Sequence, residues 1–392
     1  MSPRTASTGA GAAAIAAAAG AAGAVGAIAL ERAARRRREL RALDPTAGYD
    51  HPADEVLTVS ASDGVALHVE VNVPSGGAQP GRPTVILAHG FTLSLDSWVF
   101  QRRALTEAGY RVVAWDQRGH GQSGRSDDAP ATITPLGEDL AAVIAAAAPT
   151  GDLVLVGHSM GGMTVMALAH YHPDVVRERV LAVGLLATSA GGTGLTNLDF
   201  GPAIGHMLGR VGPGVLQRLD PHSVVLHRIR FLGRTIEDAL VARYSFDSPV
   251  SHNLVRFCGD MIFGTSFATM SQFLNAIEEL DESEALEVLH GIETLVMNGR
   301  GDLLTPPEHS DDLVRRIPGA EHVLVENCGH LIMLEHPELV CEQLLLLIQR
   351  GLRARAAHPQ GTALSGRPGV RRTLTDLARQ RRVRRARAAA AS

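Results

Sequence analysis

The fold of this chain is decided by the stretch Gly157-His158-Ser159-Met160-Gly161. The apolar run before it, at 152–156, is typical of a buried strand, and the run after it, at 162–169, has the composition of a helix. A serine between a strand and a helix must make a sharp turn, and small glycines on either side permit the close backbone packing this requires. We therefore predict a strand, a strained turn and a helix, with the Ser159 hydroxyl raised at the edge of a sheet.

Strand-like and helix-like segments alternate around this turn. Two short runs of strand type, at 56–59 and 65–73, flank the turn signal Asp63-Gly64, and this pattern predicts an antiparallel hairpin. The alternation beyond the hairpin predicts an α/β chain with a mostly parallel central sheet and flanking crossover helices. Helices are expected at 135–148, 162–169, 307–317 and 337–350.

Two loops downstream carry the partners that a nucleophilic serine needs. A serine hydroxyl is a weak nucleophile until a base takes its proton, and a third group must orient that base. The strand-like run 292–297 leads into a glycine-rich loop with Asp302, and the run 322–326 leads into a loop with His330. The chain order Ser, Asp, His is the order associated with this serine turn. We predict Ser159 as nucleophile, His330 as base and Asp302 as the orienting carboxylate.

A third loop is expected to stabilise negative charge on a reacting oxygen. The buried-strand run 84–88 ends in His89-Gly90-Phe91, where the glycine permits close approach of the backbone. The backbone N–H groups of Phe91 and Met160 are the predicted donors of an oxyanion hole. His89 is expected to be held by hydrogen bonds within its loop and to transfer no proton.

Four motifs together resemble the α/β-hydrolase superfamily over roughly residues 55 to 350. The resemblance is strongest to serine esterases, monoacylglycerol-lipase-like enzymes and cofactor-free haloperoxidase-like hydrolases. Epoxide hydrolases and haloalkane dehalogenases share the flanking loops but use an aspartate nucleophile, so a serine at position 159 argues against both. The resemblance implies structural roles for Arg118 and His120. The motifs are His89-Gly90-Phe91, the Asp116–Ser123 block, the serine turn, and the pair Asp302 and His330.

The sheet pattern is interrupted between residues 187 and 291. This stretch has helical periodicity and falls between the sixth and seventh expected strands, where members of the superfamily insert a cap over the active site. A loop of this length without structure is improbable, so we predict a helical cap. Most of its apolar side chains, such as Met270 and Phe273, are expected to pack, and a minority to line the pocket.

The composition excludes several other kinds of site. Cys258, Cys328 and Cys341 have neither paired nor metal-like spacing, so they are expected to be free thiols. No cluster suggests a metal site, and no glycine-rich loop suggests a nucleotide. The predicted chemistry therefore needs no cofactor and no metal.

Charge divides the chain into a middle and two ends. Residues 1–43 carry seven arginines against two glutamates, and residues 351–392 carry eleven arginines against one aspartate, although the whole chain has a net charge of −4. The expected organisation is a possible anchor with an Arg-rich segment at 1–43, hydrolase core at 44–186 and 292–350, the cap at 187–291, and a basic tail at 351–392 that is disordered or nascently helical. The basic ends point to an anionic membrane surface. Nucleic acid is the weaker partner because no stripe of basic and aromatic residues is present.

Residues 9–30 form an uncharged stretch rich in alanine, with five glycines, and four consecutive arginines follow shortly after it, at 35–38. Its length and the positive charge after it predict a membrane anchor with a cytoplasmic catalytic domain. A low-complexity tail on a soluble protein and a cleaved signal peptide of a secreted protein are the alternatives.

The leading functional hypothesis is a serine hydrolase that cleaves a small carboxylic ester, with a preference for a lipid-like or otherwise apolar one. One alternative is a cofactor-free haloperoxidase or perhydrolase that uses the same triad to make a peracid. A non-catalytic, membrane-associated scaffold with this fold is the other alternative. The sequence does not indicate the oligomeric state or the physiological substrate.

Overall fold

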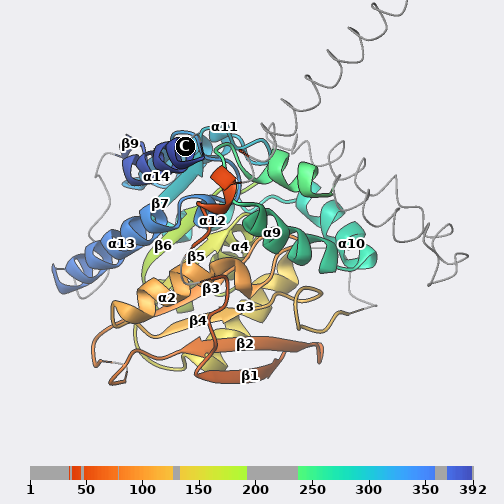
Figure 1. Cartoon of the computed structure of the whole chain (residues 1–392). Helices are drawn as coiled ribbons and strands as arrows, with labels where there is room; N and C mark the ends of the chain where they lie inside the picture. Colours follow the sequence, from red (N-terminus) through yellow and green to blue (C-terminus); the bar gives the residue numbers. More distant parts are fainter. Residues whose placement is uncertain are drawn as a thin grey trace, which may run out of the picture. The chain divides into compact units, whose positions relative to one another are not determined.

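The strands of the described residues form one nine-stranded sheet (Figure 1). The computed structural model describes residues 35, 38–45, 48–77, 79–126, 133–191, 237–357 and 369–390. The strands lie in the order β1-β2-β4-β3-β5-β6-β7-β8-β9, with β1 and β2 antiparallel, β2 and β4 antiparallel, and every other neighbouring pair parallel. The predicted hairpin and mostly parallel sheet are therefore confirmed. The strands are β1 (Glu55–Ser60), β2 (Ala66–Asn72), β3 (Thr84–Ala88), β4 (Val112–Trp115), β5 (Leu153–His158), β6 (Val180–Leu186), β7 (Glu293–Gly299), β8 (Glu321–Val325) and β9 (Val370–Leu374).

Helices connect the parallel strands and cover the sheet. Helix α3 packs on α4 and α4 packs on β5, while α13 packs on β6, β7 and α2. The helices are η1 (Leu95–Trp98), α2 (Val99–Glu107), α3 (Thr134–Ala147), α4 (Met160–Tyr171), α5 (Pro173–Arg179), α9 (His252–Gly264), α10 (Phe267–Glu278), η2 (Glu284–Leu289), α11 (Pro307–Arg316), α12 (Ile332–Glu335), α13 (Pro337–Ala357) and α14 (Leu377–Ala389).

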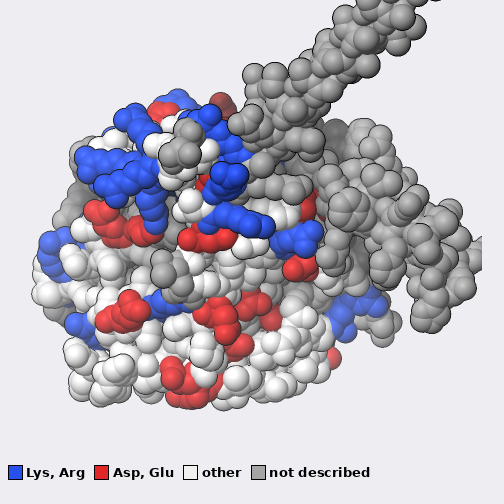
Figure 2. All heavy atoms as spheres, viewed as in Figure 1, with Lys and Arg blue, Asp and Glu red and all other residues white. Residues whose placement is uncertain are grey.

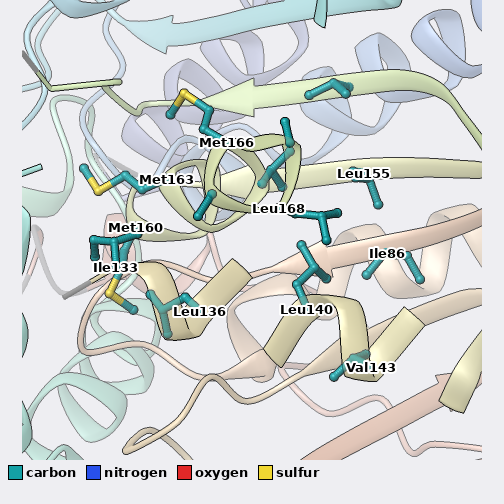
Figure 3. Close-up of a cluster of buried hydrophobic side chains, with 14 of the residues drawn as sticks. Ile86, Ile133, Leu136, Leu140, Val143, Leu155, Met160, Met163, Met166 and Leu168 are labelled. Carbon is teal, nitrogen blue, oxygen red and sulfur yellow. The ribbon is translucent and has the colours of Figure 1, made fainter. Parts of the chain in front are cut away.

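Helix α4 lies in the centre of the hydrophobic core. Its residues from Met160 to Ala169 are all buried, which explains why its sequence is apolar on every side. Figure 3 shows its methionines and Leu168 among side chains from α3 and the central strands. This packing fixes the start of α4, and with it the turn at Ser159. The labelled core residues are Ile86, Ile133, Leu136, Leu140, Val143, Leu155, Met160, Met163, Met166 and Leu168.

Strained backbone conformations occur at the edge of the sheet where the parallel strands end. Within the described ranges, four residues other than glycine have a positive φ: Thr92 (60°), Ser159 (51°), Ala187 (47°) and Asn327 (53°). Each follows the carboxyl end of a parallel strand, namely β3, β5, β6 and β8. Because strained backbone tends to occur at functional sites, this edge is the first place to look for one.

The expectation of a disordered tail from residue 351 is wrong for most of its described part. Helix α13 continues to Ala357, β9 extends the sheet beside β8, and α14 follows. Strand β9 pairs with β8 along its whole length, and two ion pairs accompany this pairing: Arg372 pairs with Glu321, and Arg371 Nη1 lies 3.1 Å from Asp311 Oδ1. A search for apolar segments misses such a strand because few of its side chains are buried.

The described part of the predicted cap range is mostly helical, with a helix at 237–245 followed by α9, α10 and η2. Residues 192–236 of that range, and the predicted anchor at 9–30, lie outside the described residues. No helix in the described ranges is long and apolar enough to cross a membrane. The anchor and the cellular location therefore stay predictions.

The described residues divide into two compact units. The larger unit lies within Pro45–Ser248 and Leu254–Asp376 and holds the whole sheet. The smaller unit lies within Met1–Asp44, Pro249–Asn253 and Leu377–Ser392, so it joins segments from the two ends of the chain. The sequence-based division treated those ends separately.

Candidate active site

Ser159 lies in a turn whose shape depends on glycine. It precedes α4 with φ 51° and ψ −120°, and it is 3% exposed. A Cβ at Gly157 would lie 2.2 Å from the Gly161 carbonyl oxygen, and a Cβ at Gly161 would lie 2.1 Å from the Ala88 carbonyl oxygen. Both distances are far below van der Waals contact, so neither position accepts a side chain. The Ser159 N–H donates to the Leu186 carbonyl at 2.9 Å and ties the turn to β6.

Asp302 and His330 come together after β7 and β8. His330 Nδ1 lies 2.9 Å from Asp302 Oδ2 and 3.1 Å from Oδ1. The carboxylate also accepts hydrogen bonds from the backbone N–H groups of Leu304 and Thr305, both at 2.9 Å, and from the Thr305 hydroxyl at 2.7 Å. Burial alone raises the pKa of Asp302, but the adjacent His330 and these bonds outweigh it and hold the pKa below its usual value.

The backbone around His330 is held from two sides. His158 Nε2 donates to the His330 carbonyl oxygen at 2.9 Å, and the two rings lie 4.8 Å apart. Glu335, which is fully buried, accepts from the Gly329 N–H at 2.7 Å and from the Ser248 N–H at 2.5 Å. Burial lowers the pKa of His158 to about 3, with a smaller contribution from His330 in the same direction, so His158 is a neutral donor.

The predicted oxyanion donors follow β3 and β5: Phe91 lies in the turn after β3, and Met160 is the first residue of α4. Among the described residues, no protein acceptor takes a hydrogen bond from the backbone N–H of Phe91 or Met160. His89 is fixed as expected: its Nδ1 lies 2.7 Å from the Gly90 carbonyl, and its Nε2 accepts from the Gln117 N–H at 3.0 Å. Burial, followed by the nearby His120, lowers the pKa of His89 to about 3, so the ring stays uncharged.

The block Asp116–Ser123 is held by hydrogen bonds to buried side chains and to backbone. Arg118 is nearly buried and donates to Asp139 through Nε at 2.6 Å and Nη2 at 2.7 Å. Asp116 accepts from the backbone N–H groups of Leu95 and Gln122, both at 2.8 Å, and burial raises its pKa to about 6 despite them. These contacts agree with the structural role expected for Arg118.

A cavity of about 90 Å³ connects the site residues. Ser159, His330 and Phe91 line it, so the structure brings the predicted nucleophile, base and oxyanion loop to one space. Most of its other walls are apolar. Met270 from the predicted cap range is one of them, whereas Leu240, Val241 and Ile262 were not singled out from the sequence.

A cluster of potential metal ligands lies beside the loop after β8 that carries His330 (the base loop), although the sequence suggested none. Side-chain atoms of Cys328, Glu335 and His336 lie within 4.8 Å of one another. Their polar atoms already serve the protein: Glu335 accepts backbone N–H groups, and His336 bonds to Asp376 Oδ2 at 3.1 Å and to the Asn327 carbonyl at 3.0 Å. The cluster is therefore best explained as support for the base loop. The three cysteines are free, as predicted.

Three supporting residues were missed by reasoning from the sequence: His158, Thr305 and Glu335. Glu335 left a signal, because it is the one charged residue in Leu331–Glu335, an otherwise apolar run. A buried carboxylate needs partners, so such a residue indicates a hydrogen-bonded role. His158 left none, because the His330 carbonyl that it bonds lies 172 residues away in the chain and only folding joins them. Thr305 left a local signal, because its hydroxyl lies three residues after Asp302, to which it donates.

Comparison with known proteins finds one family and several similar chains. A model described as the alpha/beta hydrolase fold matches residues 83–337. The chain is similar to the sn-1-specific diacylglycerol lipase ABHD11 of Mus musculus, with 29% identity over 260 residues, covering 65% of this chain and 78% of that protein.

Two solved structures share the fold. A thermophilic esterase from Thermogutta terrifontis matches with a TM-score of 0.58 and 24% identity, covering 76% of this chain and 99% of that one. A bromoperoxidase from Bacillus anthracis matches with a TM-score of 0.57 and 23% identity, covering 75% of this chain and 100% of that one. At these identities the likeness establishes the fold alone.

The buried His120 generates a prediction about stability and pH. Burial lowers its pKa to about 4 from an ordinary value of 6.5, so between these pH values the unfolded state binds one more proton than the folded state. The stability that depends on a neutral His120 is present above about pH 6.5 and is lost as the pH falls towards 4. His120→Phe removes this titration. Lowering the pH from 7 to 4.5 should therefore cost the variant about 2 to 3 kcal/mol less than the native chain in urea unfolding. Parallel losses in the two proteins would show that His120 is not held neutral.

Proposed function

The chain belongs to the α/β-hydrolase fold family, and from that premise we propose that it is a serine hydrolase that cleaves a carboxylic ester through an acyl-enzyme. The observation that carries the proposal is the shared cavity lined by Ser159, His330 and Phe91, with Asp302 bonded to His330 Nδ1. No step of the proposed chemistry uses a cofactor or a metal.

Acylation uses the orientation of His330. Asp302 stays ionised and holds the ring through Nδ1–H, which leaves Nε2 to take the proton of the Ser159 hydroxyl. The serine oxygen then bonds to the ester carbonyl carbon, and negative charge moves to the carbonyl oxygen. The backbone N–H groups of Phe91 and Met160 stabilise that charge. When the intermediate collapses, the ester C–O bond breaks and His330 protonates the departing alcohol.

Deacylation repeats these steps with water. His330 takes a proton from a water molecule, whose oxygen bonds to the acyl carbon and again pushes charge onto the carbonyl oxygen. The bond from the acyl carbon to the serine oxygen breaks, the acid leaves, and His330 returns its proton to Ser159. Each turnover therefore consumes one ester and one water and yields one acid and one alcohol.

The cavity walls favour an apolar group on the substrate. Leu240, Ile262 and Leu304 line the same space as the nucleophile, and apolar walls bind hydrocarbon by removing it from water. A lipid-like or otherwise apolar ester is therefore the preferred substrate class within the proposal. The name of the similar mouse protein, a diacylglycerol lipase, is compatible with this choice.

Perhydrolase chemistry is the second candidate, and the likeness in fold to a bromoperoxidase is compatible with it. In that reaction hydrogen peroxide replaces water as the attacking nucleophile and a peracid is released. Bromination of a dye in the presence of acetate, hydrogen peroxide and bromide, together with negligible ester hydrolysis, would favour it. A non-catalytic scaffold is disfavoured because no member of the triad is missing.

The nucleophile is tested by hydrolysis of p-nitrophenyl esters of increasing acyl length. Ser159→Ala should lower kcat by about ten-thousandfold or more, because the acyl-enzyme can no longer form. Ser189→Ala is the matched control: it removes another buried hydroxyl, which accepts from the Gly191 N–H at 3.0 Å, and it should leave kcat within a fewfold. Equal rates in the native chain and Ser159→Ala would contradict the proposal.

His158 is proposed as a positioning residue for the base. Its N–H fixes the His330 carbonyl, and loss of a partner to a buried carbonyl costs about 1–3 kcal/mol. His158→Phe keeps the ring shape without the donor and should lower kcat by about ten- to a hundredfold with little change in KM. His158→Gln retains a donor and should recover part of the rate. Equal effects of the two substitutions would show that only the volume of His158 matters.

A further inference from the structure

Three segments that are far apart in the sequence form the smaller compact unit. Arg387 Nε on α14 lies 2.7 Å from Glu39 Oε1, which joins the C-terminal helix to the N-terminal segment. Arg379 Nη2 donates to the Pro249 carbonyl at 2.9 Å, and Asn253 Nδ2 donates to Asp44 Oδ2 at 2.8 Å. These three contacts connect each segment to another, so both arginine-rich ends belong to the smaller compact unit.

Helix α14 has two distinct faces. Val383, Ala386 and Ala390 are buried, and their spacing of three and four residues places them along one side. The opposite side carries exposed residues with helical spacing, and we name it the arginine face. It consists of Leu377, Arg381, Arg384, Arg385 and Ala388.

The positive charge of the arginine face is not neutralised by the described residues. Neither Arg381, Arg384 nor Arg385 forms an ion pair with any described carboxylate. Arg387 is the helix residue that pairs with Glu39, and α14 itself contains six arginines and no acidic residue. Figure 2 shows blue side chains gathered over the region that Figure 1 labels α14.

The N-terminal segment adds to the positive charge of the same unit. Arg35, Arg38 and Arg41 are exposed there, and the intervening Glu39 is the acid already paired with Arg387. A surface with this excess of guanidinium groups attracts polyanions, and anionic membrane surfaces are among them.

We propose that the arginine face of α14 binds the surface of an anionic phospholipid bilayer. Arginine suits phosphate headgroups because its planar guanidinium can donate two parallel hydrogen bonds. Leu377 favours lipid over nucleic acid: it is 60% exposed, lies on the arginine face, and offers a side chain for the boundary between headgroups and acyl chains. Helix α14 has no aromatic residue with which a base could stack. This proposal is independent of the hydrolase activity.

Co-sedimentation of the full-length chain with vesicles tests the proposal. Vesicles of phosphatidylcholine containing about one third phosphatidylglycerol are compared with phosphatidylcholine alone, which measures binding that does not depend on charge. Replacing Arg381, Arg384 and Arg385 together by Gln should weaken partitioning onto the anionic vesicles by about a hundredfold. Raising the salt to about 0.5 M should weaken native binding similarly, because salt screens exposed charges.

A matched control changes the same number of charges elsewhere. Arg177, Arg315 and Arg353 are exposed and lie on α5, α11 and α13, so their joint replacement by Gln should leave binding nearly native. Thermal unfolding by circular dichroism verifies that each variant is folded. Leu377→Ser should reduce vesicle binding severalfold and leave binding to a DNA duplex unchanged.

Three results would overturn the proposal. Equal losses in the two triple variants would mean that net charge, and not the arginine face, drives binding. Native partitioning that is equal on neutral and anionic vesicles would remove the anionic surface as partner. Tighter binding to the duplex than to anionic vesicles at the same salt, with no effect of Leu377→Ser, would assign the face to nucleic acid.

Discussion

The whole site depends on the strained backbone at Ser159. A φ of 51° costs a serine about 1–3 kcal/mol, and the turn persists only because its surroundings permit no other path. The glycines at 157 and 161 let the neighbouring backbones meet, the N–H of Ser159 is tied to β6, and α4 is buried along ten successive residues. Strand order adds the rest, because the carboxyl ends of the parallel strands β3, β5, β7 and β8 bring the loops that carry Phe91, Ser159, Asp302 and His330 to one edge of the sheet.

Around the strained turn, the polar groups are fixed by bonds to backbone. Asp302 accepts two N–H groups besides bonding to His330, and Glu335 and His158 hold the backbone on either side of the base. His89, His120 and His158 are buried and neutral near pH 7, which keeps extra positive charge away from the cavity. Such preorganisation means that little of the site must rearrange when charge develops on a reacting oxygen. Ser248, in the predicted cap range, donates its N–H to Glu335, which also accepts the Gly329 N–H beside His330. One carboxylate therefore bonds both segments.

Local signals explain which features could be predicted. The serine turn, the hairpin and the helices α3, α4, α11 and α13 are encoded by glycine placement and apolar periodicity within short windows, so the sequence was sufficient for them. Helices α2 and α5 were not predicted. The roles assigned to Ser159, Asp302, His330, Phe91 and Met160 followed from motif order, and they stay proposals until activity is measured. Features that depend on distant partners could not be predicted. Strand β9 pairs with β8 and with Glu321 and Asp311. His158 bonds to the His330 carbonyl, and Arg387 pairs with Glu39, and in each case the partner is distant in the sequence.

The central claim is that Ser159 is an activated nucleophile, and covalent labelling tests it most directly. A fluorophosphonate reacts with a serine whose proton is removed by an adjacent base, and the adduct resembles the tetrahedral intermediate. Mass spectrometry of the labelled and digested full-length chain should find one adduct, on Ser159, and Asp302→Asn should slow labelling severely because the base loses its orienting carboxylate. Labelling at another residue, or no labelling of a folded chain, would contradict the account.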